Sequence, residues 1–241
     1  MSLTIALKGT DGLVLAADSR VTKGYTLDGP KTRDNSKKFI RLNDDCGVLT
    51  YGISDVGNSG ITVLQQAILK YNNNHSSMSP ILEKGIMVFK SVSSEWTRKN
   101  PEVKRRDKDV GFIIAGINRI EKGFEIYNFQ SPEFIPKRVG SGSLLAGQWH
   151  IAKFFVNRLY TENMRVDKLT ELAALLLNET MAVEKTVGGA IRLATITNTK
   201  GFQWVLEAEV KSIIKKNELF RKFFKKHFHS SLMSAVNNDR E

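Results

Sequence analysis

The chain has 241 residues, 41% of them hydrophobic, with one cysteine and a formal net charge of +11. This length suits one domain that buries a sizeable core without staples, and the single Cys46 excludes an internal disulfide and fits a reducing environment. No run approaches the roughly 20 apolar residues of a membrane span, and the first residues lack the basic and apolar regions of a secretory signal. We therefore expect a cytoplasmic protein.

The beginning of the chain predicts a hairpin that ends in charged side chains. Residues 3–8 alternate as in a strand, a Thr-Asp-Gly turn signal follows, and residues 13–17 form a second apolar strand. Asp18 and Arg20 come directly after that strand, so the hairpin places them beside residue 2. A carboxylate is costly to bury unless it is paired. The residues alone therefore favour a structural Asp–Arg pair at this point.

The rest of the chain alternates pairs of predicted helices with groups of predicted strands. Residues 21–37 are polar and turn-rich, which is typical of a loop or an irregular hairpin. Further strands are expected at 36–42, 46–53, 110–118, 125–129, 190–197 and 202–206. Helices are expected after 54–58, over about 80–99, from 143 to about 160, and from Asp167, as the cap, to about 183. This order predicts two antiparallel sheets between pairs of helices.

The opening resembles the proteasome β-subunit family, including its bacterial relatives such as HslV and Anbu. That family has a short strand, a turn of the type K-x-D-G, an apolar strand and then A-x-D-x-R, which here read as residues 8–12 and 16–20. In the family the mature chain begins with a nucleophile sixteen residues before the Asp, and this position is Ser2 once Met1 is removed. The resemblance covers about residues 2–206. It implies an α+β fold of four αββα layers, with a domain at 2–210 and a basic C-terminal extension at 211–241.

The resemblance also assigns the parts of a catalytic site. A serine hydroxyl needs a base within hydrogen-bond reach, and a free α-amine with a pKa of ~8 supplies one. Lys38 matches the family lysine whose charge disfavours protonation of that amine, and Asp18 would hold Lys38 charged and oriented. Gly52 matches the glycine whose backbone N–H binds the oxyanion. Without this context, Lys38 is a solvated lysine at a strand end and Gly52 ends a strand.

Two later segments match the family in part. Gly140-Ser141-Gly142-Ser143 matches a turn whose first serine approaches the N-terminal amine, which assigns that role to Ser141, although flexible turns look the same. Residues 184–189 match Asp-x-x-Ser-Gly-Gly with Glu184 in place of Asp and Val187 in place of Ser, so one hydroxyl is missing. The family also suggests which residues lie around the substrate pocket, namely Val21, Ser36, Thr50 and Ser54. These side chains are small or medium in size, which argues against a specificity for bulky acidic substrate residues.

Residues 211–229 concentrate the positive charge, with seven Lys or Arg residues against one Glu. Their apolar residues fall near one helical face: Ile213, Ile214, Phe220, Phe224 and Phe228. Such a helix can cap its own core with its lysines in solvent, or pack on a neighbouring subunit. It can also be attracted to nucleic acid or to an anionic membrane. A second basic cluster lies at 104–108.

The sequence therefore predicts an N-terminal-nucleophile peptidase that cleaves peptides or unfolded proteins within a homo-oligomeric ring or spiral. We expect no cofactor and no metal, because the four histidines are scattered without metal-ligand spacing. Three alternatives stay open. They are an inactive structural subunit of the same fold, an amidase or transpeptidase whose acyl-enzyme is resolved by an amine, and a nucleic-acid or membrane binder that uses residues 211–229. The sequence names neither the natural substrate nor an unfoldase partner.

Overall fold

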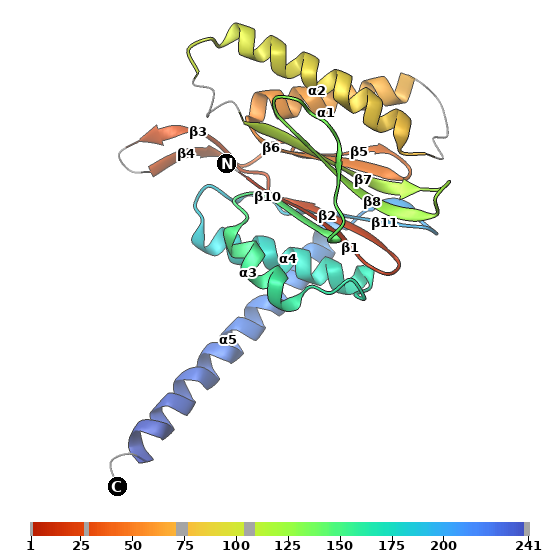
Figure 1. Ribbon diagram of the computed structural model, residues 1–241. Helices are drawn as coiled ribbons and strands as arrows, with labels where there is room; N and C mark the ends of the chain where they lie inside the picture. Colours follow the sequence, from red (N-terminus) through yellow and green to blue (C-terminus); the bar gives the residue numbers. More distant parts are fainter. Residues whose placement is uncertain (1, 27–28, 71–76, 104–108, 239–241) are drawn as a thin grey trace. The chain divides into compact units, whose positions relative to one another are not determined.

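Two five-stranded antiparallel sheets carry the fold in a computed structural model of the chain, which describes residues 2–26, 29–70, 77–103 and 109–238 (Figure 1). The first sheet has the order β10 (Ser143–Gly147), β1 (Leu3–Lys8), β2 (Gly12–Ala17), β11 (Arg192–Thr197), β12 (Gly201–Trp204). The second has the order β5 (Phe39–Asn43), β6 (Cys46–Gly52), β7 (Val110–Asn118), β8 (Gly123–Gln130), β9 (Lys137–Arg138). A separate hairpin pairs β3 (Val21–Thr26) with β4 (Gly29–Arg33).

Helices cover the outer face of each sheet and give four αββα layers, which confirms the predicted fold class (Figure 1). α1 (Ser54–Lys70) and α2 (Ser79–Lys99) lie over the second sheet, and α3 (His150–Leu159) and α4 (Val166–Val183) lie over the first. Apolar residues recur every three or four positions on the inward faces of these helices. On α4 the buried set includes Leu169, Leu172, Ala173, Leu176 and Leu177.

The core forms two packed layers. Leu15 of the first sheet and Leu49 and Ile113 of the second belong to one fully buried cluster between the sheets. Between α2 and the second sheet, the Phe89 and Phe112 rings stack with centroids 3.7 Å apart. Each such side chain contributes roughly 1.5–3 kcal/mol through burial. The two sheets thus support the segments at their strand ends, from which Ser2, Asp18 and Lys38 come.

The β1–β2 hairpin is held at both of its ends. At the turn, the Thr10 N–H donates into the loop before α4, and the Val166 N–H donates to the Asp11 carboxylate at 2.8 Å. At the open end, the Asp18 carboxylate accepts from the Leu3 N–H within the hairpin and from the Lys38 ammonium and the Gly188 N–H outside it. Neither the turn nor the strand ends can therefore shift independently of the rest of the domain.

Two element predictions are wrong. The helix predicted from 143 begins only at His150, because residues 143–147 form β10, an edge strand that pairs with β1. A short apolar run such as Leu144–Ala146 fits a buried strand and a helix equally well, so periodicity does not separate them. Asp167 lies in the first turn of α4, and its N-cap is Arg165.

The chain divides into two compact units, Met1–Val205 and Leu206–Glu241, whereas the sequence predicts a boundary at 210–211. The second unit contains α5 (Glu207–Asn238), on which the Leu219 side chain is 58% exposed. The predicted basic cluster at 104–108 lies outside the described residues, as do the side chains of Phe220, Phe224 and Phe228. Within the described part, no helix is long and apolar enough to cross a membrane.

Candidate active site

The ends of four strands meet at a cavity of about 190 Å³. Ser2 directly precedes β1, Lys38 directly precedes β5, and Gly52 is the last residue of β6. These three residues and all four predicted pocket residues lie among those that line it: Ser2, Val21, Thr22, Ser36, Lys38, Thr50, Tyr51, Gly52, Ile53, Ser54 and Asn58. The structure thus brings seven of the predicted residues to one cavity.

Asp18 is buried beneath this cavity and its carboxylate accepts four hydrogen bonds. One oxygen accepts from the Lys38 ammonium at 2.8 Å and from the Leu3 N–H at 3.0 Å. The other accepts from the backbone N–H groups of Arg20 at 3.1 Å and Gly188 at 3.0 Å. Four donors compensate the loss of water around a buried carboxylate. The Asp–Arg side-chain pair that the residues alone favoured does not form, because the Arg20 guanidinium binds Asp34 instead.

Lys38 is a buried cation, with only 6% of its side chain exposed. Burial lowers the pKa of Lys38 below its ordinary value, and the charge and hydrogen bond of Asp18 oppose this shift. A buried ion pair in which both partners keep hydrogen bonds is tolerated, whereas removing one partner leaves an uncompensated charge. The pair therefore fixes a positive charge at the wall of the cavity that Ser2 lines.

Ser2 is 3% exposed, and its backbone is tied to the segment after β10. The Gln148 N–H donates to the Ser2 carbonyl at 2.7 Å. Gly147 has φ +86°, and a Cβ there would lie 1.8 Å from the same carbonyl oxygen, so the close approach requires glycine. These contacts hold Ser2 in the register of β1.

Gly52 ends β6 just before α1, in a backbone conformation that only glycine adopts readily. Its φ is +88°, and a Cβ would lie 2.2 Å from the carbonyl oxygen of Asp109. Thr50, two residues earlier on β6, donates its hydroxyl to the Gly111 carbonyl at 3.1 Å and its N–H to the Lys38 carbonyl at 2.9 Å. The cavity wall at Thr50 is therefore fixed to Lys38.

Ser141 does not approach Ser2, which corrects the role that the resemblance assigned to it. β10 runs antiparallel to β1, so Gly147 pairs with Leu3 while Ser143 pairs with Leu7. Ser141 is exposed and lies beyond that far end, roughly 20 Å along β1 from Ser2 at about 3.3 Å per residue. Its hydroxyl donates to the Ser143 carbonyl at 3.2 Å.

Glu184 also lies away from the cavity lining, at the end of α4. It accepts hydrogen bonds from the Thr186 hydroxyl at 2.7 Å and the Thr186 N–H at 3.0 Å, and these bonds lower the pKa of Glu184. Val187 is fully buried. The 184–189 segment reaches the site through Gly188, whose N–H binds Asp18.

Several residues near Ser2 were not predicted from the sequence. Gly147 and Gln148 take the place beside Ser2 that was assigned to Ser141. Asn58 comes from the first turns of α1, and Tyr51 precedes Gly52 at the end of β6. The sequence feature that could have indicated this part of the site is Gly147. A glycine after an apolar run and before a helix often marks a place where another backbone segment comes close.

Comparisons with known proteins find relatives over most of the chain. The proteasome subunit family matches residues 2–196. Proteasome subunit beta 1 of Pyrobaculum calidifontis is 26% identical over 219 residues, which cover 89% of this chain and 99% of that protein. Proteasome subunit beta 2 of Cenarchaeum symbiosum is 24% identical over 220 residues, covering 88% of this chain and 92% of that protein.

Solved structures share the fold. Anbu (ancestral beta-subunit) from Yersinia bercovieri superposes with a TM-score of 0.69 at 15% identity, covering 92% of this chain and 96% of that one. An Anbu (Gly-1) mutant from Hyphomicrobium sp. strain MC1 gives 0.65 at 16% identity, covering 94% and 97%. With a family match over most of its length and a four-layer fold shared with Anbu, the chain belongs to the proteasome subunit family.

Proposed function

We propose that this chain is an N-terminal-nucleophile peptidase in which Ser2 attacks peptide bonds after removal of Met1. The observation that carries the proposal is the buried Lys38–Asp18 ion pair at the cavity that Ser2 lines. A buried charge is costly, and stabilising a nucleophile is a chemical use for it. Family membership supports the same reading.

In the proposed reaction, the α-amine of Ser2 accepts the proton of its own hydroxyl while the oxygen attacks the peptide carbonyl carbon. The charge of Lys38 disfavours protonation of the amine and stabilises the developing negative charge on the Ser2 oxygen. The Gly52 N–H binds the oxyanion of the tetrahedral intermediate. The protonated amine then gives its proton to the leaving nitrogen, and water hydrolyses the ester to release the acid and restore Ser2.

Two residues support this site from outside the cavity. Asp18 holds the Lys38 ammonium, and its other oxygen binds Gly188. Glu184 shapes the turn that presents Gly188, through its bonds to Thr186. We assign Glu184 this indirect role in place of contact with the reacting atoms.

We further propose that the peptidase works as a homo-oligomeric ring or spiral in the cytoplasm, on peptides or unfolded proteins. Large apolar side chains are exposed on three helices of the first unit: Leu69 on α1, Met87 on α2, and Phe154 and Leu159 on α3. Burying these side chains against neighbouring subunits would remove their apolar surface from water. The buried free thiol of Cys46 suits a reducing compartment.

The direct test is the intact mass of the purified protein, with and without an electrophile that targets N-terminal nucleophiles. We expect a mass that lacks Met1 and gains one adduct. Ser2→Ala should gain none and should lose cleavage of fluorogenic peptides by at least about 10³-fold, since the nucleophile is absent. Ser59→Ala, an exposed serine on α1 outside the cavity lining, is the control and should behave like the unchanged protein.

A mass that retains Met1, with no adduct and no cleavage, would contradict the proposal and favour a structural subunit. A structural subunit needs no serine hydroxyl at position 187, so this reading would account for the buried Val187 where the family usually has serine. Adding amine nucleophiles to the peptide assay distinguishes a transpeptidase from a peptidase. Products joined to the amine in excess of hydrolysis would identify a transpeptidase.

A further inference from the structure

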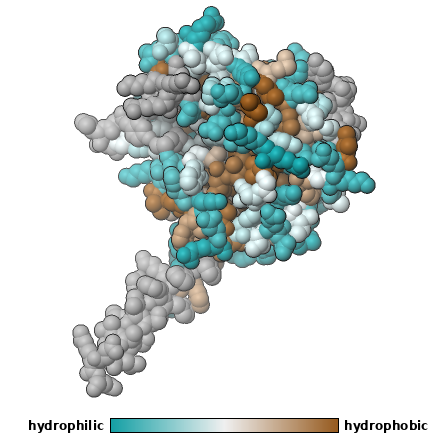
Figure 2. Space-filling view, in the orientation of Figure 1, coloured by the Kyte–Doolittle hydropathy of each residue, from teal (hydrophilic) through white to brown (hydrophobic). Residues whose placement is uncertain are grey.

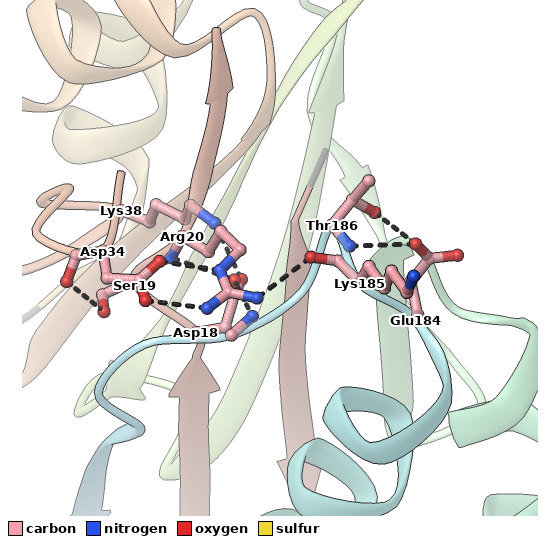
Figure 3. Close-up of polar contacts among 9 residues, drawn as sticks. Asp18, Ser19, Arg20, Asp34, Lys38, Glu184, Lys185 and Thr186 are labelled. Carbon is pink, nitrogen blue, oxygen red and sulfur yellow. Dashed lines mark hydrogen bonds and ion pairs between the residues drawn. The ribbon is translucent and has the colours of Figure 1, made fainter. Parts of the chain in front are cut away.

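One side chain outside the cavity joins two separate segments of the site. The Arg20 guanidinium forms a two-pronged ion pair with Asp34, with Nε–Oδ1 and Nη2–Oδ2 distances of 2.7 Å (Figure 3). Its remaining nitrogen, Nη1, donates to the Lys185 carbonyl at 3.0 Å. The guanidinium also packs on Gly188, where a Cβ would lie 2.5 Å from its central carbon. Arg20 thus connects the loop at 34–38 to the turn at 184–189.

Each of the two connected segments supplies one donor to Asp18. The 34–38 loop ends in Lys38, whose ammonium binds one carboxylate oxygen, and the 184–189 turn provides the Gly188 N–H for the other. The 34–38 loop is anchored further at Ser19, whose hydroxyl donates to the Asp34 carbonyl at 3.0 Å. The Ser19 carbonyl in turn accepts from the Ser36 N–H at 2.9 Å.

The exposure of the Arg20–Asp34 pair indicates what it does. The Arg20 side chain is 26% exposed and that of Asp34 is 45% exposed. Ion pairs this accessible to water contribute little to folding stability. A bidentate Arg–carboxylate pair does impose a defined geometry on the segments it joins. Its main effect is therefore on the position of the 34–38 loop.

Charge also links Asp34 to the site. The charged groups that act on Lys38 are Asp18, Asp34 and Arg20: the two carboxylates raise the pKa of Lys38, whereas Arg20 lowers it. The Arg20 hydrogen bonds, in turn, hold the pKa of Asp34 below its ordinary value. Removing the Asp34 carboxylate takes away one of the two carboxylates that raise the pKa of Lys38 and leaves the opposing charge of Arg20 in place.

We propose that Asp34 is a positioning residue of the active site, which acts through Arg20 to hold the 34–38 loop so that Lys38 stays on Asp18 beside Ser2. The inference rests on the proposed peptidase function for its kinetic consequence. Asp34 is absent from the cavity lining among the residues that the structure describes, so its effect is on Lys38 and Ser2 rather than on substrate.

The test is Asp34→Asn, which keeps the shape of the side chain and removes its charge. We expect kcat/KM to fall about 10-fold or more, mainly through kcat, because small displacements of catalytic groups are costly. The alkaline limb of the pH profile should move to lower pH, since Lys38 loses its proton more easily. Asp34→Glu should recover part of the rate. The melting temperature should change by no more than about 4 °C, as expected for an exposed pair.

Glu95→Gln is the matched control, because it removes the same charge from another exposed ion pair, with Lys99 on α2. It should leave both the rate and the pH profile unchanged. An Asp34→Asn protein with unchanged kcat/KM and an unchanged pH profile would overturn the inference. So would a loss of activity that follows only the loss of folded protein, with no displacement of the pH profile.

A second readout separates this inference from the proposed function. The Lys38 side-chain signal can be followed by NMR in lysine-labelled protein, with Lys38→Met identifying it. A titration midpoint at lower pH in Asp34→Asn supports the inference even if no peptide is cleaved, in which case the peptidase proposal alone fails. Equal midpoints in the two proteins overturn the inference whether or not the protein is active.

Discussion

At the scale of single residues, the proposed peptidase should prefer uncharged substrate side chains in the cavity beside Ser2. Among the described residues that line it, Lys38 is the charged one, and Asp18 already pairs with it. The Ser36 hydroxyl donates to the Asn58 side-chain oxygen at 3.4 Å. A charged substrate group would have no partner in this cavity, and burying an unpaired charge is costly.

Asn58→Asp should change this preference, because it adds a carboxylate to the cavity with almost no change in shape. We expect the kcat/KM ratio of peptides with Lys before the cleaved bond to peptides with Leu there to rise about 10-fold or more, through the new charge pair. Asn157→Asp, at an exposed site on α3, is the control and should not alter the ratio. An unchanged ratio in Asn58→Asp would show that the side chain binds elsewhere.

The sequence predicts the residues whose place depends on a fixed spacing along one hairpin. Ser2 and Asp18 are such a pair, and their spacing supports the family resemblance. The resemblance then identifies Lys38 as the lysine of the site. Arg20 was assigned to the wrong partner, because Asp34 comes from a loop whose path no local pattern specifies. Asn58 was missed for the same reason, since its approach to the cavity depends on the angle between β6 and α1.

At the scale of elements, most of the predicted strands and helices form, and the short apolar run at 143–147 is the one assigned to the wrong type. β7 is continuously apolar and flanked by polar residues, which fits a central strand. β10 is a strand only because β1 offers it an open edge, and this pairing is long-range. The same stretch carried the assignment of Ser141, which the resemblance placed where Gly147 and Gln148 lie.

The turn after α4 gives a prediction for acid stability. The Thr186 hydroxyl and then its N–H lower the pKa of Glu184 in the folded chain. A group of this kind adds stability above its unfolded pKa, of about 4.3, and that stability is lost as the pH falls through the folded pKa. The melting temperature should therefore fall more steeply from about pH 6 to about pH 3 in the unchanged protein than in Glu184→Gln.

The effect should be small, because Glu184 is partly exposed and its bonds are local. Thermal unfolding followed by circular dichroism measures it. Glu121→Gln removes the same charge from an exposed turn and should retain the steeper slope. Parallel slopes for Glu184→Gln and the unchanged protein would mean that the Thr186 bonds form equally well without the charge.

At the scale of the whole molecule, the surface carries both charge and exposed apolar groups. On the face shown in Figure 2, hydrophilic residues surround hydrophobic ones that gather near its middle. The proposed assembly predicts a solution mass that is a multiple of 27.1 kDa, measurable by light scattering after gel filtration. Phe154→Asp should shift the population towards smaller species, because that side chain is 54% exposed on α3.

Lys153→Asp, the neighbouring exposed position, changes the charge without removing apolar surface and is the control for that experiment. It should keep the mass of the unchanged protein. A mass of one chain at micromolar concentration in the unchanged protein would contradict the assembly. It would leave the exposed apolar groups on α1, α2 and α3 without the partner that we assign to them.

The two-ended anchoring of the β1–β2 hairpin has a consequence for how related sequences are compared. An insertion within either strand reverses which side chains face the core, and one in the turn displaces the groups that bind the α3–α4 connection, such as Asp11. The number of residues between Ser2 and Asp18 is therefore fixed, because adding or removing a single residue would disturb the site. Homologues that keep the proposed reaction should align between Ser2 and Asp18 without gaps. A gap in this interval would indicate a homologue that has lost the reaction.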